Sequence, residues 1–196
     1  YFKKAAYVSV RDTGCKCKPE VYKGVITMNN NFEDDLEDGQ MGERAVRHFV
    51  ETEWHKRFIT YGDTAAFDIM FQNNLQKPVF FEVKTDMFEK DWDKGGTGNM
   101  AIEYKCRGKP SGIRTTLAGW FAYYFPNITE NHLWIIRMDK LKELIKDNKF
   151  KTVDAGEPDE KTGKKVSRCY LIPRFDFRGY FSIFTFDGNR WLPSLD

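Results

Sequence analysis

The stretch that most constrains this chain is VFFEVKTD, residues 79–86, which follows the turn-like segment NNLQKP. Successive side chains of a strand point to opposite faces, so one face here is apolar while the other carries Glu82, Lys84 and Asp86. A charged side chain inside an apolar strand is costly unless it has a partner. We therefore expect this strand to contribute to a functional site as well as to the core.

A second strand is predicted just before it, over AAFDIMF, residues 65–71. A short polar turn separates the two strands, so they are expected to pair as a hairpin. Alternation then places Asp68 on the face that carries Glu82 and Lys84. The residues expected on the opposite, apolar face are Phe67, Ile69 and Phe71.

A helix is predicted over GERAVRHFVETEWHKRF, residues 42–58. Its apolar residues recur at helical spacing and form a stripe made of Val46, Phe49, Val50 and Trp54. Glu43 projects on the same side as this stripe. It is either an exposed acid favoured by the helix dipole or a further carboxylate beside the strand pair, and we prefer the second interpretation.

The acids of this group create an electrostatic conflict. Asp68 and Glu82 would repel each other, and Lys84 compensates only part of their charge. A hard divalent cation such as Mg²⁺, held by carboxylates and water, resolves the conflict.

A glutamate on a first helix, then an aspartate, then Glu-x-Lys on adjoining strands resembles the PD-(D/E)XK nuclease superfamily. Here these elements are Glu43, Asp68 and EVK at 82–84. One departure is Phe67, which stands where the name of the motif has proline. The resemblance implies an α/β protein with a restriction-endonuclease-like mixed β-sheet flanked by helices. Within the superfamily the chain looks like Holliday junction resolvases and phage-type nucleases.

The resemblance also implies a mechanism. Asp68, Glu82, the Val83 carbonyl and Glu43 would bind Mg²⁺, with Mn²⁺ as a substitute. The metal would polarise the scissile phosphate and lower the pKa of an attacking water. Lys84 would orient or deprotonate that water, or stabilise charge on the phosphate.

A basic segment follows the predicted strand 100–106. In that strand Glu103 and Lys105 repeat the acid–base spacing, and Glu103 is either an adjunct to the same site or part of a surface pair. The residues expected to contact DNA are Lys105, Arg107, Lys109, Ser111, Arg114 and Thr115. The alternative to a DNA-contacting role is that this segment is an ordinary solvated loop with a helix N-cap.

The remaining pattern predicts further elements around this centre. Residues 1–38 are expected to hold a small pair of strands and an acidic linker, and residues 39–196 the nuclease-like domain. Asp139 is the expected N-cap of the helix that follows the strand HLWIIRM. The other expectations are a helix over 113–125, a loop over 151–166, and one or two strands over 168–187.

Composition bounds the class of protein. The chain has 196 residues, 41% of them hydrophobic, with a formal net charge of +2. No apolar run approaches the roughly 20 residues that span a bilayer, and no signal-peptide pattern opens the sequence, so we expect no membrane partner and a cytoplasmic location, including that of a virus-infected cell. Cys15 and Cys17 lack the further ligands of a zinc site.

These observations favour a Mg²⁺-dependent DNA endonuclease, including one that acts on branched DNA. Junction cutting would require two active sites and hence a homodimer. The alternatives are an exonuclease of the same superfamily, a nucleic-acid-binding module without cleavage, and an interaction protein whose charges form an ion-pair network.

Overall fold

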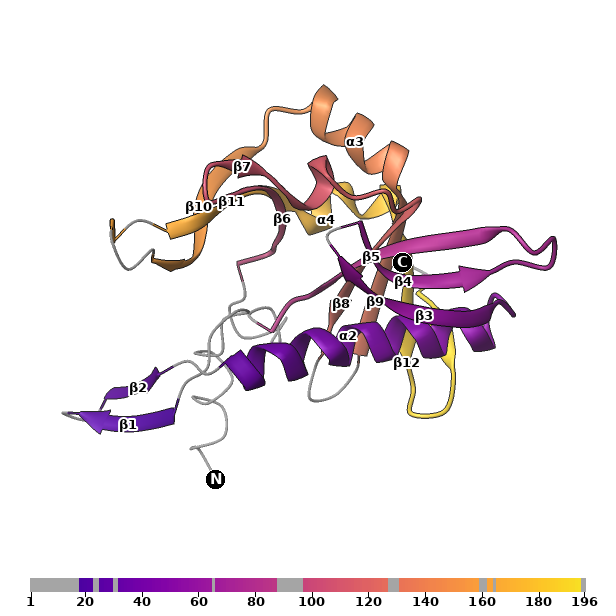
Figure 1. The fold of residues 1–196 in the computed structure, drawn as a ribbon, viewed down its shortest axis with the longest axis horizontal. Coiled ribbons are helices and arrows are strands. Elements are labelled where there is room, and N and C mark those ends of the chain that lie inside the picture. The colour runs from indigo at the N-terminus through magenta and orange to yellow at the C-terminus, as the bar shows by residue number, and fades with distance from the viewer. Residues whose placement is uncertain are drawn as a thin grey trace.

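The computed structural model is mixed α/β, with mostly strands and a few helices that flank a large sheet (Figure 1). It describes residues 18–22, 25–29, 32–64, 66–87, 97–126, 131–158, 162–163 and 165–194.

The main sheet has seven strands in the order β13-β12-β9-β8-β5-β4-β3. Neighbouring strands are antiparallel except β5 and β8, which run parallel. The strands, in chain order, are β3 (Arg57–Thr64), β4 (Phe67–Gln72), β5 (Pro78–Thr85), β8 (Trp120–Phe125), β9 (Asn131–Arg137), β12 (Ser182–Phe186) and β13 (Trp191–Pro193).

A second sheet has four strands in the order β10-β11-β6-β7. Two separate parts of the chain build it, because β6 and β7 lie between β5 and β8 in sequence while β10 and β11 follow β9. Its strands are β6 (Asn99–Cys106), β7 (Lys109–Pro110), β10 (Lys151–Pro158) and β11 (Lys165–Pro173).

Helices cover the main sheet from both sides. One face packs against α2 (Phe32–Thr52), and the other faces the second sheet and α3 (Met138–Asp147) (Figure 1). Two apolar cores result, one on each face of the main sheet. The short helices are α4 (Arg174–Phe177), η1 (Gly112–Arg114) and η2 (Arg178–Tyr180).

The predicted apolar stripe anchors α2. Val46, Phe49 and Val50 are fully buried, and they share a core with Phe81 of β5. Trp54 lies just beyond the helix and packs edge-on against Phe49. The stripe therefore fixes the helix face that looks toward β5.

The helix predicted over 113–125 is wrong. Only Ile113 and Arg114, the last two residues of η1, are helical there, and Trp120–Phe125 forms β8. Residues 121–125 are buried without alternation, because β8 is a central strand with a core on each side. A continuous apolar run of this kind fits a buried strand and a helix equally well by pattern.

Three smaller predictions also differ from the structure. The stretch expected to be an acidic linker is helical from Phe32, so a boundary at residue 38 falls within α2. Residues 151–166, expected to be a loop, contain β10 and the start of β11. The helix α3 begins at Met138 with Arg137 at the N-cap, and Asp139 in its first turn pairs with Arg137.

The two strands of the predicted hairpin, β4 and β5, form a meander together with β3. The strand predicted at 100–106 belongs to the second sheet. The strand β3 escaped prediction because its start was assigned to the preceding helix. Phe67 also departs from expectation, since it packs with Phe80 on the core opposite α2, beside an irregularity in the pairing of β3 with β4.

The N-terminal part agrees with the expected pair of strands where it is described. The strands β1 (Lys18–Tyr22) and β2 (Val25–Asn29) form an antiparallel hairpin. Cys15 and Cys17 lie outside the described residues. Within the described part of the chain, no helix is both long and apolar enough to cross a membrane.

Candidate active site

The predicted acids meet where β5 separates from β4. Backbone pairing between these strands ends at Ile69 and Phe81, whereas β5 continues to pair with β8 as far as Thr85. Within the described part of the chain, residues 82–85 therefore have a strand neighbour on one side only. We call this place the fork.

Asp68 lies at the open side of the fork. Its Oδ2 atom accepts a hydrogen bond of 2.6 Å from the Val83 amide. Burial raises the pKa of the Asp68 carboxyl, while this hydrogen bond and the charge of Lys84 lower it. Lys84 is half-buried and close enough to act on Asp68, as the hairpin predicted.

Glu43 reaches the fork from α2. The helix approaches β5 closely at Gly42, where an added Cβ would clash with Oγ1 of Thr85 and lie 3.4 Å from Cγ1 of Val83. Burial, and next the charge of Asp68, raise the pKa of Glu43 to about 7. The half-buried position beside Asp68 agrees with the second interpretation of this residue.

Glu82 faces the second sheet from β5. Burial, and next the charge of Asp68, raise the pKa of Glu82 to about 7. The charge of Glu103 also contributes to this rise, whereas an interaction with Thr116 and the charge of Lys142 oppose it. The charges of two other acids, Asp68 and Glu103, therefore act on Glu82.

A segment that we call the strap, residues 111–119, lies beside these carboxylates. Its first hydroxyl, that of Ser111, donates a 2.7 Å hydrogen bond to Oε1 of Glu103. Farther along, Thr116 is buried and donates to the Ala66 carbonyl at 3.0 Å, just ahead of Asp68. The strap thus joins β6 to the start of β4 beside Glu82.

Gly112 allows the strap to start where it does. It has φ +50°, which L side chains rarely adopt, and an added Cβ would clash with the Glu103 carbonyl. The close approach of the strap to β6 therefore depends on the absence of a side chain here.

Two of the residues predicted to contact DNA make contacts within the protein. Ser111 is occupied with Glu103, and the guanidinium carbon of Arg114 lies 4.7 Å from the ring centroid of Tyr104. The expected helix N-terminus is absent, because the three-residue η1 leads into β8 instead of a longer helix. The remaining four are half-buried Lys105 and the exposed residues Arg107, Lys109 and Thr115.

The site includes residues that sequence reasoning did not select. Thr116 and Lys142 act on Glu82 but come from distant parts of the chain, and no local pattern marks them. Glu103 had two interpretations, and its effect on Glu82 places it beside the acid group. Asp91 and Asp93, which precede β6, lie outside the described residues.

The donors at the fork suit a hard cation in their chemistry. Asp68, Glu43 and Glu82 supply carboxylate oxygens, and their mutual repulsion is the kind that a cation relieves. As the side chains stand, however, no group of three or more acids, histidines or cysteines in the described residues is arranged to hold a metal ion. Metal binding would require the carboxylates to rotate toward one another.

Comparisons with known protein families, with curated proteins and with solved structures find no match to this chain. The interpretation of the fork therefore rests on its own geometry and charges. Three carboxylates come from three different elements, and one lysine lies beside them. Burial and neighbouring charge raise the pKa of two of these carboxyls, those of the glutamates, to about 7.

Proposed function

We propose that this protein is a Mg²⁺-dependent deoxyribonuclease that hydrolyses phosphodiester bonds within DNA strands. The observation that carries the proposal is the meeting of Glu43, Asp68, Glu82 and Lys84 at the fork, with the pKa of both glutamates raised to about 7 by burial and by Asp68. Strongly shifted acids beside a lysine are typical of a functional site.

The energetics favour a site that a cation completes. Half-buried acids that repel one another destabilise the folded state, and a protein gains nothing from them in packing. A divalent cation would lower the pKa of each carboxyl and turn repulsion into attraction. The fork supplies oxygen donors, which are the ligands that Mg²⁺ prefers.

Each residue then has a role in hydrolysis. Asp68 and Glu82 would hold Mg²⁺, with Glu43 completing the ligand set, and the bound metal would polarise the scissile phosphate and acidify water. Lys84 would orient the attacking water or stabilise negative charge on the phosphate. Thr116, which lowers the pKa of Glu82, would favour the ionised form of that carboxyl.

The order of elements also supports the resemblance to PD-(D/E)XK nucleases. A helix that carries Glu43 precedes a three-stranded meander that carries Asp68 and EVK, and β8 then lies parallel to β5. The fork is thus formed by neighbouring strands of one sheet, with the helix packed over it. A restriction-endonuclease-like fold is part of this proposal.

A second candidate is a nucleic-acid-binding module without cleavage. It is favoured by the finding that no acid group in the described residues is arranged to hold a metal as the side chains stand. Such a module would bind DNA equally well in EDTA and in Mg²⁺, and it would leave the strands intact.

The decisive experiment is a cleavage panel with single-stranded, duplex, flapped and four-way-junction DNA in Mg²⁺, Mn²⁺ or EDTA. Nicking of circular DNA would identify an endonuclease, whereas digestion of linear DNA alone would identify an exonuclease. Efficient junction cutting would imply a homodimer, which light scattering can check.

Two variants make the panel specific to the fork. Glu82→Gln should lose cleavage and keep its fold, whereas Glu143→Gln, on the exposed side of α3, should cut like the wild type. Undiminished metal-dependent cutting by Glu82→Gln would refute the site assignment.

A further inference from the structure

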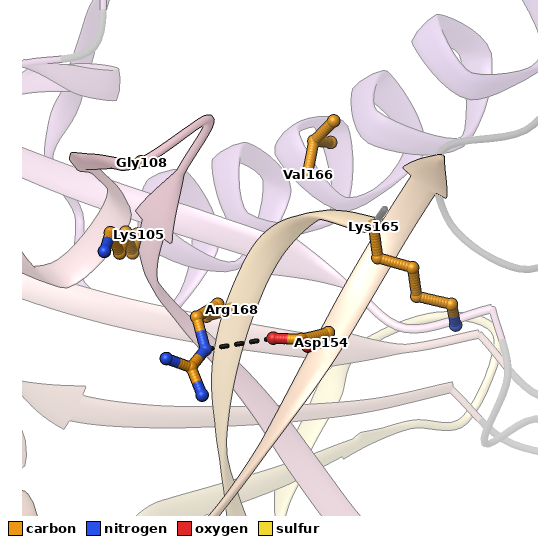
Figure 2. A pocket seen from close by; sticks show the side chains of 6 residues that line it. All are labelled: Lys105, Gly108, Asp154, Lys165, Val166 and Arg168. Atoms are coloured by element: carbon orange, nitrogen blue, oxygen red, sulfur yellow. Dashed lines mark ion pairs between the residues drawn. The ribbon is translucent and has the colours of Figure 1, made fainter. Parts of the chain in front are cut away.

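A basic hollow of about 450 Å³ lies on the second sheet. Figure 2 shows Arg168 between Lys105 and Asp154, with Lys165 on the far side of Asp154. Three cationic side chains and one acidic side chain thus surround it, together with Gly108 and Val166. The hollow has an excess of positive charge in a protein whose overall charge is nearly balanced.

We propose that this hollow binds a backbone phosphate of the DNA substrate, outside the fork itself. The inference rests on the proposed function, because it takes DNA as the ligand. It adds Arg168 and Lys165 to the DNA-contacting surface and retains Lys105 from the residues predicted for it. A phosphate would accept hydrogen bonds from a guanidinium and an ammonium group at once.

The pairing of β6 with β11 places like charges together. Lys105 and Arg168 are directly opposite each other in the register, and like charges in that position are destabilising. Asp154, opposite Arg168 on β10, pairs with its Nε atom at 2.9 Å. The Arg168 guanidinium also has two terminal nitrogens, which could donate to a phosphate held between Arg168 and Lys105.

The hollow is accessible to a large ligand. The side chains of Arg168 and Asp154 are 48% and 61% exposed, so a DNA strand could reach them without displacing the core. Their ion pair is exposed and therefore weak, and it would not compete strongly with a phosphate.

The strand β6 connects the hollow to the fork. It carries Glu103, which acts on Glu82, and two residues later Lys105, which lines the hollow. Two residues of a strand span about 6.6 Å. A strand of DNA with one phosphate in the hollow would therefore extend readily toward the carboxylates.

Binding of a labelled duplex DNA, followed by fluorescence anisotropy in EDTA, tests this inference without cleavage of the probe. Lys105→Glu should weaken binding about tenfold, and Lys105→Gln should lower the slope of log K against log salt by about 1. Lys77→Glu, on the exposed turn between β4 and β5, is the matched control and should bind within about twofold of the wild type.

Thermal unfolding separates binding from stability. Lys105→Glu puts an acid opposite Arg168, so its melting temperature should rise by about 1–3 °C while DNA binding falls. A role in stability alone would predict a change in melting temperature with wild-type binding, and that result would overturn the inference.

The outcomes also distinguish this inference from the proposed function. Wild-type protein that cleaves DNA, with Lys105 variants that bind normally and keep the wild-type salt slope, would refute the hollow and leave the nuclease intact. Wild-type protein that neither binds nor cleaves DNA would refute both.

Discussion

The Val83 amide donates a 2.6 Å hydrogen bond to Oδ2 of Asp68 at the point where β4 and β5 stop pairing. A side-chain oxygen therefore accepts the hydrogen bond that this amide would otherwise donate to a carbonyl of a neighbouring strand. The contact ties the Asp68 carboxylate to the backbone of the strand that carries Glu82 and Lys84. It fixes Asp68 relative to Glu82 and Lys84 and leaves the carboxylate oxygens of Glu82 out of the contact.

This contact makes Asp68→Asn an informative change. The amide oxygen can still accept the Val83 hydrogen bond, so the protein should fold and melt close to the wild type. The lost charge should lower Mg²⁺-dependent cleavage by about 10² or more. Initial rates of plasmid nicking measure the effect, with Asp139→Asn on exposed α3 as the control, and wild-type rates for Asp68→Asn would contradict the proposed role.

The raised pKa of Glu43 and Glu82 predicts how stability depends on pH without metal. Burial and Asp68 raise each pKa from 4.5 to about 7, so between these values the folded state binds more protons than the unfolded state. The free energy of unfolding should therefore fall as pH rises from about 4.5 to about 7 and level off above. For Glu82 the loss is of the order of 2 kcal/mol after allowance for its partial exposure.

Denaturant titrations in EDTA across this pH range measure the trend, and Glu82→Gln should flatten it. Mg²⁺ should stabilise the protein more at high pH than at low pH, because it binds the deprotonated carboxylates. Equal stabilisation by Mg²⁺ at both ends of the range would argue against metal binding at the fork.

Gly42→Ala tests how Glu43 is positioned. The added methyl group would meet the Thr85 hydroxyl, so α2 should shift and stability should fall by about 1–3 kcal/mol despite the better helix propensity of alanine. Gly39→Ala in the same helix has nothing within 4 Å and should stabilise the protein by about 0.5–1 kcal/mol.

A double-mutant cycle identifies the contact. Thr85 Oγ1 is buried and has no hydrogen-bond partner among the residues that the structure describes, so Thr85→Ala removes the obstacle without breaking a hydrogen bond seen there. The pair Gly42→Ala and Thr85→Ala should show a favourable coupling of about 1 kcal/mol or more. Strict additivity would mean that the close approach at Gly42 does not limit the helix.

Thr116→Val tests the strap. The change removes the hydroxyl that donates to the Ala66 carbonyl and accepts from the Ala118 amide at 3.1 Å. The same hydroxyl lowers the pKa of Glu82, so this pKa should rise further in the variant, and stability should fall by about 1–3 kcal/mol. The pH–rate profile of cleavage should move to higher pH.

Thr115→Val is the matched control for this change. Thr115 is exposed and its hydroxyl donates to the Gly112 carbonyl at 3.3 Å, so stability and the pH–rate profile should stay near the wild type. Similar effects of the two substitutions would rule out a specific role for Thr116.

Local patterns predicted the parts of the fork that lie close together in sequence. Alternation along a strand placed Glu82 and Lys84 together, and the short turn placed Asp68 near them. Helical spacing placed Glu43 on the buried side of α2. These inferences needed only a period of two, a period of 3.6 and one tight turn.

Contacts made by distant segments were beyond such patterns. The apolar pattern of Trp120–Phe125 fits a buried strand and a helix equally well. Its position between two cores, which the sequence does not reveal, makes it a strand. Thr116 and Lys142 gain their meaning from the fold that brings them to Glu82. The second sheet was missed as a unit, because its halves are separated by β8, β9 and α3.

This divided second sheet has a consequence for synthesis of the protein on the ribosome. The strand β6 gains its neighbour β11, Lys165–Pro173, only after β8, β9, α3 and β10 have been translated. Until then, β6 has an unpaired edge, and such edges invite association with other chains. We therefore expect the nascent protein to need chaperone protection until β11 has emerged, when the carboxylates have already been made but the second sheet beside them is still incomplete.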